Sequence, residues 1–183
     1  IKQESESFKP VYTKQYKKPA WKNNTQLSDK MGKYWEGRKI NQTILKELYI
    51  TEGMEFMPQF GKEVNTVQFN YFVDGELVNV KYRTGDKKFK SCPDAELVPY
   101  NIDSLLGRDK AICVEGEVDC MSFLAIGYKN CISVPNGASD NTSYLDRFME
   151  KYFDDKEVIY VAVDTDNKGV TLRNALIARF GSE

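Results

Sequence analysis

The chain has 183 residues, of which 41% are hydrophobic and 29% are charged, as in an ordinary soluble globular protein with one core or two small lobes. No apolar run approaches the roughly 18 residues needed to cross a membrane, and the polar N-terminal residues lack a secretory signal, so we expect a cytoplasmic protein. The chain has no histidine and no Cys-x-x-Cys pair, which excludes a zinc ribbon within it and leaves carboxylates, lysines, arginines and metal ions as catalytic groups.

Basic residues are concentrated at the start of the chain. Residues 1–39 contain ten Lys or Arg against four Asp or Glu, whereas the remainder contains 16 against 23. Residues 1–27 have no helical or strand period, and we predict a basic linker or arm there. Its lysines and its aromatic residues Phe8, Tyr12, Tyr16 and Trp21 are suited to single-stranded nucleic acid. A solvated tether to a neighbouring domain is the alternative, and both descriptions are compatible.

Residues 28–108 are predicted to form a small α+β lobe. Ser28 and Asn41 are typical N-caps for two short helices. Two alternating apolar and polar segments, residues 64–73 and 76–84, are joined by Asp74-Gly75, which predicts a tight β-hairpin. A basic loop follows, over residues 85–96.

Strands and helices alternate from residue 109 to residue 183. We expect strands at residues 110–114, 131–134 and 157–163 and helices at 117–127, 140–152 and 171–181. Short connections between alternating strands and helices are typical of right-handed βαβ units with a parallel sheet, hence an α/β fold. Three strands make a thin sheet, and we expect the domain to be incomplete at its C-terminal end.

Carboxylates follow two of these strands. Glu115 ends the first strand and Asp119 lies one helical turn later, while Asp164 ends the third strand and Asp166 lies two residues on. If the strands are neighbours, the four carboxylates meet at the edge of the sheet where α/β proteins bind ligands. Like charges held together are unfavourable, and Mg²⁺ or Mn²⁺ would relieve the repulsion. We expect two ions about 4 Å apart, the arrangement used for phosphoryl transfer.

Each motif alone usually marks only a helix cap or a turn. The pair, Glu115-Gly116-Glu117-Val118-Asp119 followed by Asp164-Thr165-Asp166-Asn167-Lys168-Gly169, closely resembles the Toprim domain of bacterial-type primases, topoisomerases and some nucleases. The Pro-Asn-Gly-Ala turn at residues 135–138 is similar to the glycine turn of that family. The resemblance implies that Glu115 acts as acid, base or metal ligand and that Asp119, Asp164 and Asp166 bind metal. Glu117 is expected to point away from them and to cap the helix.

The preceding residues resemble phage primase-helicases and Twinkle-type helicases. Lys81 and Arg83, on a strand expected at the sheet edge, and Lys87 in the basic loop are similar to the basic strand and loop of those proteins. The resemblance implies that these three residues bind the phosphates of incoming nucleotides.

Together these features predict a DNA primase core that makes short RNA primers on single-stranded DNA from nucleoside triphosphates. Its expected partners are that template, the triphosphates, and helicase and zinc-ribbon domains of the same or an associated chain. The alternatives are another Toprim enzyme, either a nuclease or a topoisomerase with a nucleophilic tyrosine, and an inactive Toprim lobe that serves a helicase as a DNA-binding or assembly module. The third acidic motif of the family is expected beyond residue 183.

Overall fold

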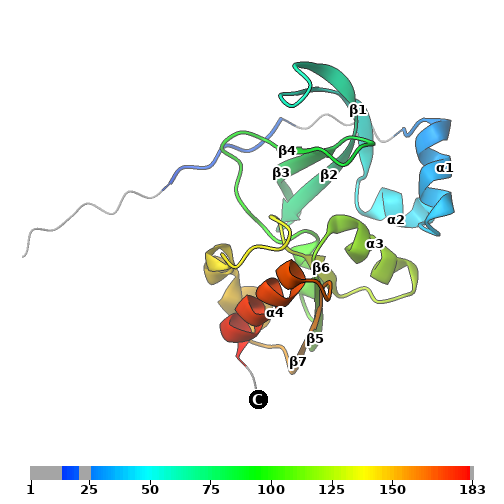
Figure 1. Cartoon of the computed structure of the whole chain (residues 1–183). Coiled ribbons are helices and arrows are strands. Elements are labelled where there is room, and N and C mark those ends of the chain that lie inside the picture. The colour runs from blue at the N-terminus through cyan, green and yellow to red at the C-terminus, as the bar shows by residue number, and fades with distance from the viewer. Residues whose placement is uncertain (1–13, 21–25, 182–183) are drawn as a thin grey trace, which may run out of the picture.

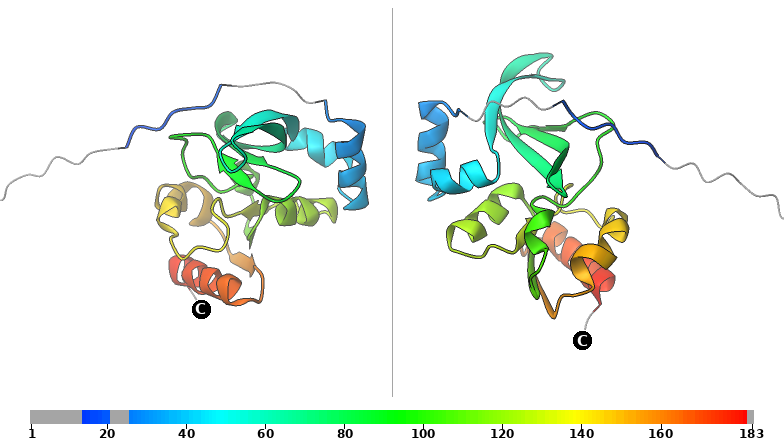
Figure 2. Two further views of the ribbon diagram at one scale, coloured as in Figure 1. Left: turned by 45° about the horizontal axis from the view of Figure 1, so that its top comes forward. Right: turned by 180° about the vertical axis from the view of Figure 1, so that it is seen from behind.

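The computed structural model describes residues 14–20 and 26–181, which form an antiparallel N-terminal lobe stacked on a parallel C-terminal lobe (Figure 1). We use these names for residues 26–108 and 109–181. The predictions for Phe8, Tyr12 and Trp21 lie outside the described residues. Residues 14–20 run as an extended segment beside the N-terminal lobe (Figure 2), where Lys17 pairs with Asp94 at 3.0 Å.

Two short helices open the N-terminal lobe, both capped as predicted. In α1 (Asp29–Gly37) the Met31 N–H donates to the Ser28 hydroxyl at 3.3 Å, and in α2 (Gln42–Glu47) the Ile44 N–H donates to the Asn41 side chain at 3.0 Å. Each cap satisfies a backbone donor that a helix start leaves unpaired.

The antiparallel sheet has four strands in chain order, β1 (Thr51–Met57), β2 (Lys62–Val73), β3 (Glu76–Arg83) and β4 (Phe89–Ser91). The predicted hairpin is confirmed: Asp74 and Gly75 both have positive φ, 54° and 74°, as a two-residue hairpin of this type requires. β1 was not predicted from the sequence, and β4 lies within the expected basic loop. Because β4 pairs with β3 through residues 81–83, β3 is not the edge strand it was expected to be.

The C-terminal lobe is an α/β layer, as predicted. Its order along the chain is β5 (Lys110–Val114), α3 (Glu117–Ala125), β6 (Cys131–Ser133), β7 (Val158–Ala162) and α4 (Asn167–Phe180). The three strands form a parallel sheet in the order β6-β5-β7. The helix expected at 140–152 is instead a 3-10 turn (Ser143–Phe148) followed by a π turn (Met149–Phe153), and α4 begins four residues earlier than expected.

One hydrophobic core extends through both lobes. Tyr100, in the segment that connects them, packs edge-to-face on Phe69 and Tyr71 of β2, with ring centroids 6.1 and 5.0 Å away. Its backbone N–H also donates to the Ser133 carbonyl of β6 at 2.9 Å. A domain boundary after residue 108 stays a prediction, since the buried side chains are continuous across it. Among the described residues, no helix is long and apolar enough to cross a membrane.

Candidate active site

The two strand ends that carry the acidic motifs are neighbours. β5 and β7 pair in parallel, with Val114 opposite Ala162, so Glu115 and Asp164 leave the sheet at the same edge. β5 comes first in sequence but lies between β6 and β7. The connection from β5 to β6 therefore runs to one side of the sheet, and the connection from β6 to β7 crosses back to the other side. Ligands bind at such reversal points in open α/β sheets.

Glu115 is the least solvated of the four predicted carboxylates. Its side chain is partly buried, and its Oε2 atom is buried without a hydrogen-bond partner. Burial, together with the negative charges of Asp164, Asp166 and Asp119, raises the pKa of Glu115, and the Ala138 backbone N–H only partly opposes this. Glu115 therefore lies within electrostatic reach of the other three carboxylates.

Asp166 and Asp119 also start helices. The Gly169 N–H donates to Asp166 Oδ1 at 2.8 Å, which caps α4. The Gly116 N–H donates to Asp119 Oδ2 at 3.1 Å at the start of α3. Partial desolvation raises the pKa of Asp119, and so do the negative charges of Asp164 and Glu117. The hydrogen bond from the Gly116 backbone and the positive charge of Arg38 lower this pKa and only partly oppose the rise. Helix starts concentrate backbone donors and positive dipole at this edge of the sheet.

Gly169 makes the α4 start possible. A Cβ atom at Gly169 would lie 2.0 Å from the Asp164 backbone oxygen, so no other residue fits without a backbone shift. The close approach fixes α4 against the end of β7. The position of the Asp164 side chain therefore depends on a glycine five residues later.

A divalent cation at these carboxylates would need further ligands besides them. In the parts of the chain that are described, no three acidic, cysteine or histidine side chains form a complete ligand set of their own. Mg²⁺ does not need one, because it usually keeps waters and takes one or two carboxylates plus substrate phosphates. The unpartnered Glu115 oxygen and the mutual repulsion of the cluster are the features that a cation would relieve.

A pocket of about 490 Å³ lies between the two lobes at this edge. Phe89 and the turn at residues 135–137 line the pocket. Its charged lining consists of four carboxylates and two ammonium groups, those of Glu115, Glu117, Asp119, Asp164, Lys81 and Lys90. The pocket is therefore negative overall but carries its cations on the N-terminal lobe. A hollow of similar volume, about 470 Å³, lies between α1 and α2, away from these carboxylates.

Glu117 is placed differently from the expectation. Its side chain is 4% exposed and points into the contact between the lobes, where it accepts from the Lys81 ammonium at 2.6 Å and from the Tyr71 hydroxyl. The expectation that Glu117 faces away was wrong because β2 and β3 lie over the start of α3 and supply these donors, a tertiary contact that strand and helix patterns do not encode.

Of the three predicted phosphate-binding residues, Lys81 lines the pocket and Arg83 and Lys87 do not. Arg83, two residues on, is 8% exposed and its guanidinium donates to the Tyr34 hydroxyl of α1 at 3.1 Å. Lys87 is exposed in the β3–β4 loop, with a φ of 62°. Phosphate binding by all three stays a prediction.

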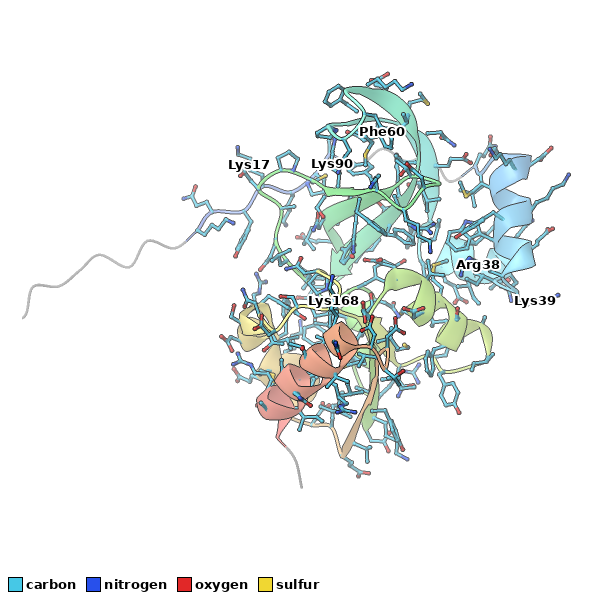
Figure 3. The ribbon with its side chains drawn as sticks, viewed as in Figure 1. Lys17, Arg38, Lys39, Phe60, Lys90 and Lys168 are labelled. Atoms are coloured by element: carbon cyan, nitrogen blue, oxygen red, sulfur yellow. The ribbon has the colours of Figure 1, made fainter. Side chains whose placement is uncertain are left out.

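Phe89 and Lys90 lie in the predicted basic loop and are not among the predicted site residues. Phe89 is 42% exposed at the pocket, and Lys90 pairs with Glu55 of β1 at 2.6 Å. Figure 3 shows Lys90 on the N-terminal lobe and Lys168 at the first turn of α4, on the side nearer that lobe. The pairing of β4 with β3, which brings Phe89 and Lys90 to the pocket, has only a three-residue signal in the sequence.

A parallel sheet with an acidic edge, joined to an antiparallel lobe, is the fold of primase cores that contain a Toprim domain. Residues 112–183 match the family described as Toprim-like. The primase fragment of the bacteriophage T7 primase-helicase protein superimposes with a TM-score of 0.67 at 19% identity, covering 92% of this chain and 70% of that fragment. The resemblance to Toprim primases and the predicted fold class are therefore confirmed.

Two curated proteins of Arabidopsis thaliana are similar in sequence. The Twinkle homolog protein, chloroplastic/mitochondrial, is 27% identical over 170 residues, which is 86% of this chain and 23% of that protein. The Primase homolog protein is 32% identical over 130 residues, or 64% of this chain and 39% of that protein. The chain thus spans 23% of the length of one of these curated relatives and 39% of the other.

Proposed function

We propose that the chain is the RNA-polymerase core of a DNA primase, which joins nucleoside triphosphates into short primers on single-stranded DNA. The observation that supports this best is the pocket at the β5–β7 edge, where acidic residues of the Toprim fold face lysines of an antiparallel lobe. A growing primer needs both a metal site at the reacting phosphate and cations along the triphosphate.

The charge balance of the pocket supports metal dependence. Four carboxylates against two lysines leave the lining with an excess of negative charge, which repels a triphosphate. Glu115, Asp119, Asp164 and Asp166 would hold Mg²⁺ or Mn²⁺, which supplies charge neutralisation and activates the attacking 3′-hydroxyl when it is bound. Lys81 and Lys87 would contact the phosphates, beside the starts of α3 and α4, where helix ends favour anions.

The wider assignments also belong to this proposal. Single-stranded DNA would be the template, and the similarities to the T7 primase-helicase fragment and to the Twinkle homolog support a helicase domain as a partner. A zinc-ribbon domain stays a prediction. Cytoplasmic localisation stays a prediction, since the name of that relative places it in chloroplasts and mitochondria. In the described part of the arm, Lys17 and Lys18 pair with Asp94 and Glu76, exposed pairs that a polyanion would displace at little cost.

Primer synthesis is the direct test. The protein, incubated with single-stranded DNA, ribonucleoside triphosphates and Mg²⁺, should yield short oligoribonucleotides, and chelation should abolish them. Asp164→Asn should remove the product, whereas the matched control Asp154→Asn, an exposed carboxylate that does not line the pocket, should not. DNA binding retained by both variants, with no product from the unchanged protein, would favour an inactive assembly module. Cleavage of DNA without triphosphates would favour a nuclease.

A further inference from the structure

A largely buried ion pair connects the two lobes at the pocket. The Glu117 side chain, 4% exposed, is the first residue of α3, and its Oε1 atom accepts from Lys81 of β3 at 2.6 Å. The same oxygen accepts from the hydroxyl of Tyr71 on β2, a side chain that is 1% exposed. Three residues from three elements therefore meet at one carboxylate.

The arrangement restricts the Lys81 ammonium. An ammonium has three N–H groups; one donates to Glu117 and another to the Pro135 carbonyl at 3.1 Å. The side chain also lies against Phe89, with the nitrogen 5.3 Å from the ring centroid. One N–H is left for a ligand oxygen, and its direction is fixed because the first two partners fix the nitrogen.

Tyr71 in turn fixes the carboxylate. Burial and the neighbouring Glu117 charge raise the pKa of Tyr71 above its ordinary value, so the hydroxyl keeps its proton and donates. A buried carboxylate that lost one of its donors would be less favourable and would shift towards solvent. The hydroxyl thus acts on Lys81 through Glu117.

We propose that Glu117 and Tyr71 are positioning residues for Lys81, which hold its free N–H towards the triphosphate and make nucleotide binding depend on the contact between the lobes. This inference rests on the proposed nucleotide-binding function of the pocket. Neither residue touches the reacting atoms in this role, so their loss should alter substrate affinity more than the chemical step.

Tyr71→Phe is the sharpest variant because it removes one hydroxyl and leaves every charge unchanged. The chain offers a matched control in Tyr100→Phe: Tyr100 is also 1% exposed, packs against Tyr71 and has a buried hydroxyl without a hydrogen-bond partner. The control removes the same atom from the same core but does not touch the Glu117 carboxylate.

The first measurement needs no nucleotide. The acylation rate of Lys81, followed by mass spectrometry on the folded protein, should rise about tenfold in Tyr71→Phe, since one hydrogen bond to a charged group is worth about that factor. Tyr100→Phe should leave the rate unchanged. Equal rates in the two variants would overturn the proposal, even if the protein binds no triphosphate at all.

The second measurement is the affinity for a Mg²⁺–triphosphate, with kcat and KM for primer synthesis. In Tyr71→Phe, KM should rise about three- to tenfold with kcat changed by less than about twofold, as expected for lost ground-state binding. A failure of the unchanged protein to bind triphosphate would contradict the proposed function but not the positioning of Lys81, which the acylation rate reports separately.

Glu117→Gln separates positioning from simple charge. Removing a carboxylate from a negative pocket favours an anion, so a triphosphate should bind more tightly if only charge matters. If Glu117 positions Lys81, KM should instead rise and the acylation rate of Lys81 should increase. Tighter binding in Glu117→Gln with an unchanged acylation rate would overturn the inference.

Discussion

Val114 on β5 and Ala162 on β7 lie opposite each other in the parallel sheet, and this pairing brings the two acidic motifs together across almost fifty residues of sequence. Glu115 and Asp164 follow one and two residues beyond the pair. This proximity contributes to the raised pKa of Glu115, for which burial and then the negative charge of Asp164 are the two largest causes. Each motif alone is a common helix start; only the adjacency of the strands brings the two motifs to the same edge of the sheet.

Gly169→Ala should destabilise the protein and misplace Asp164. The added Cβ would lie 2.0 Å from the Asp164 carbonyl oxygen, and the backbone must move to admit it. We expect a loss of about 1–3 kcal/mol in the free energy of unfolding, measured by denaturant titration, together with weaker Mg²⁺ binding. Gly32→Ala in α1 is the control, where nothing lies within 4 Å of the new atom; it should stabilise by about 0.5–1 kcal/mol. Equal effects of the two substitutions would contradict the close approach.

Asp166 variants should separate the helix cap from the metal site. Asp166→Asn keeps a cap for the Gly169 N–H but removes the charge, so stability should change little while primer synthesis is lost. Asp166→Ala should lose synthesis and also about 1 kcal/mol of stability. Thermal unfolding and primer assays on both variants are the measurements. Full activity in Asp166→Asn would show that Asp166 only caps α4.

Glu52→Gln should weaken the attachment of α1 to the sheet in a pH-dependent way. Glu52 accepts from the Ser28 N–H at 2.7 Å, from the Ser28 hydroxyl at 2.9 Å and from Asn65 at 2.5 Å. Burial opposes ionisation, but these donors prevail and lower the pKa of Glu52 from its usual 4.5. At pH 7 we expect a loss of about 1–3 kcal/mol, measured by urea unfolding.

The sign of the pH dependence follows from the lowered pKa. The unfolded chain binds a proton more readily than the folded one, so the contribution of Glu52 is present above the unfolded pKa and is lost as pH falls through the folded pKa. The difference between the two proteins should therefore shrink in acid. Glu63→Gln, an exposed glutamate of β2, should show little difference at either pH. A difference that grows in acid would refute the assignment.

Arg83→Ala tests whether Arg83 stabilises the fold or binds phosphate. The guanidinium is buried beneath α1, donates to the Tyr34 hydroxyl and lies 6.0 Å from the Tyr34 ring centroid. We expect a loss of about 1–3 kcal/mol in the free energy of unfolding, measured by thermal unfolding. The change in triphosphate affinity should be smaller than the change that Lys81→Ala causes. The opposite outcome is an Arg83→Ala protein that stays stable but binds triphosphate more weakly than the Lys81→Ala protein does. That outcome would support the phosphate contact that the resemblance implies.

Local signals in the sequence determined most elements of the fold. Ser28 and Asn41 mark helix starts because their side chains accept from nearby N–H groups, and Asp74-Gly75 marks a hairpin because both residues tolerate positive φ. β1 gave a weaker signal, since it contains Gly53 and leaves Met54 and Phe56 exposed. The segment at 140–152 was predicted as one helix, but in the structure it forms 3-10 and π turns.

By itself, the sequence determined which residues carry charge and where strands end, and therefore that Glu115, Asp119, Asp164 and Asp166 stand at strand ends and helix starts. These properties depend on side-chain chemistry and neighbours a few residues away. The tertiary structure alone decided what those charges face: Lys81 pairs with Glu117, Arg83 with Tyr34, and β4 brings Phe89 and Lys90 to the pocket. Such contacts join residues tens of positions apart, and they form only when the two sheets share a core.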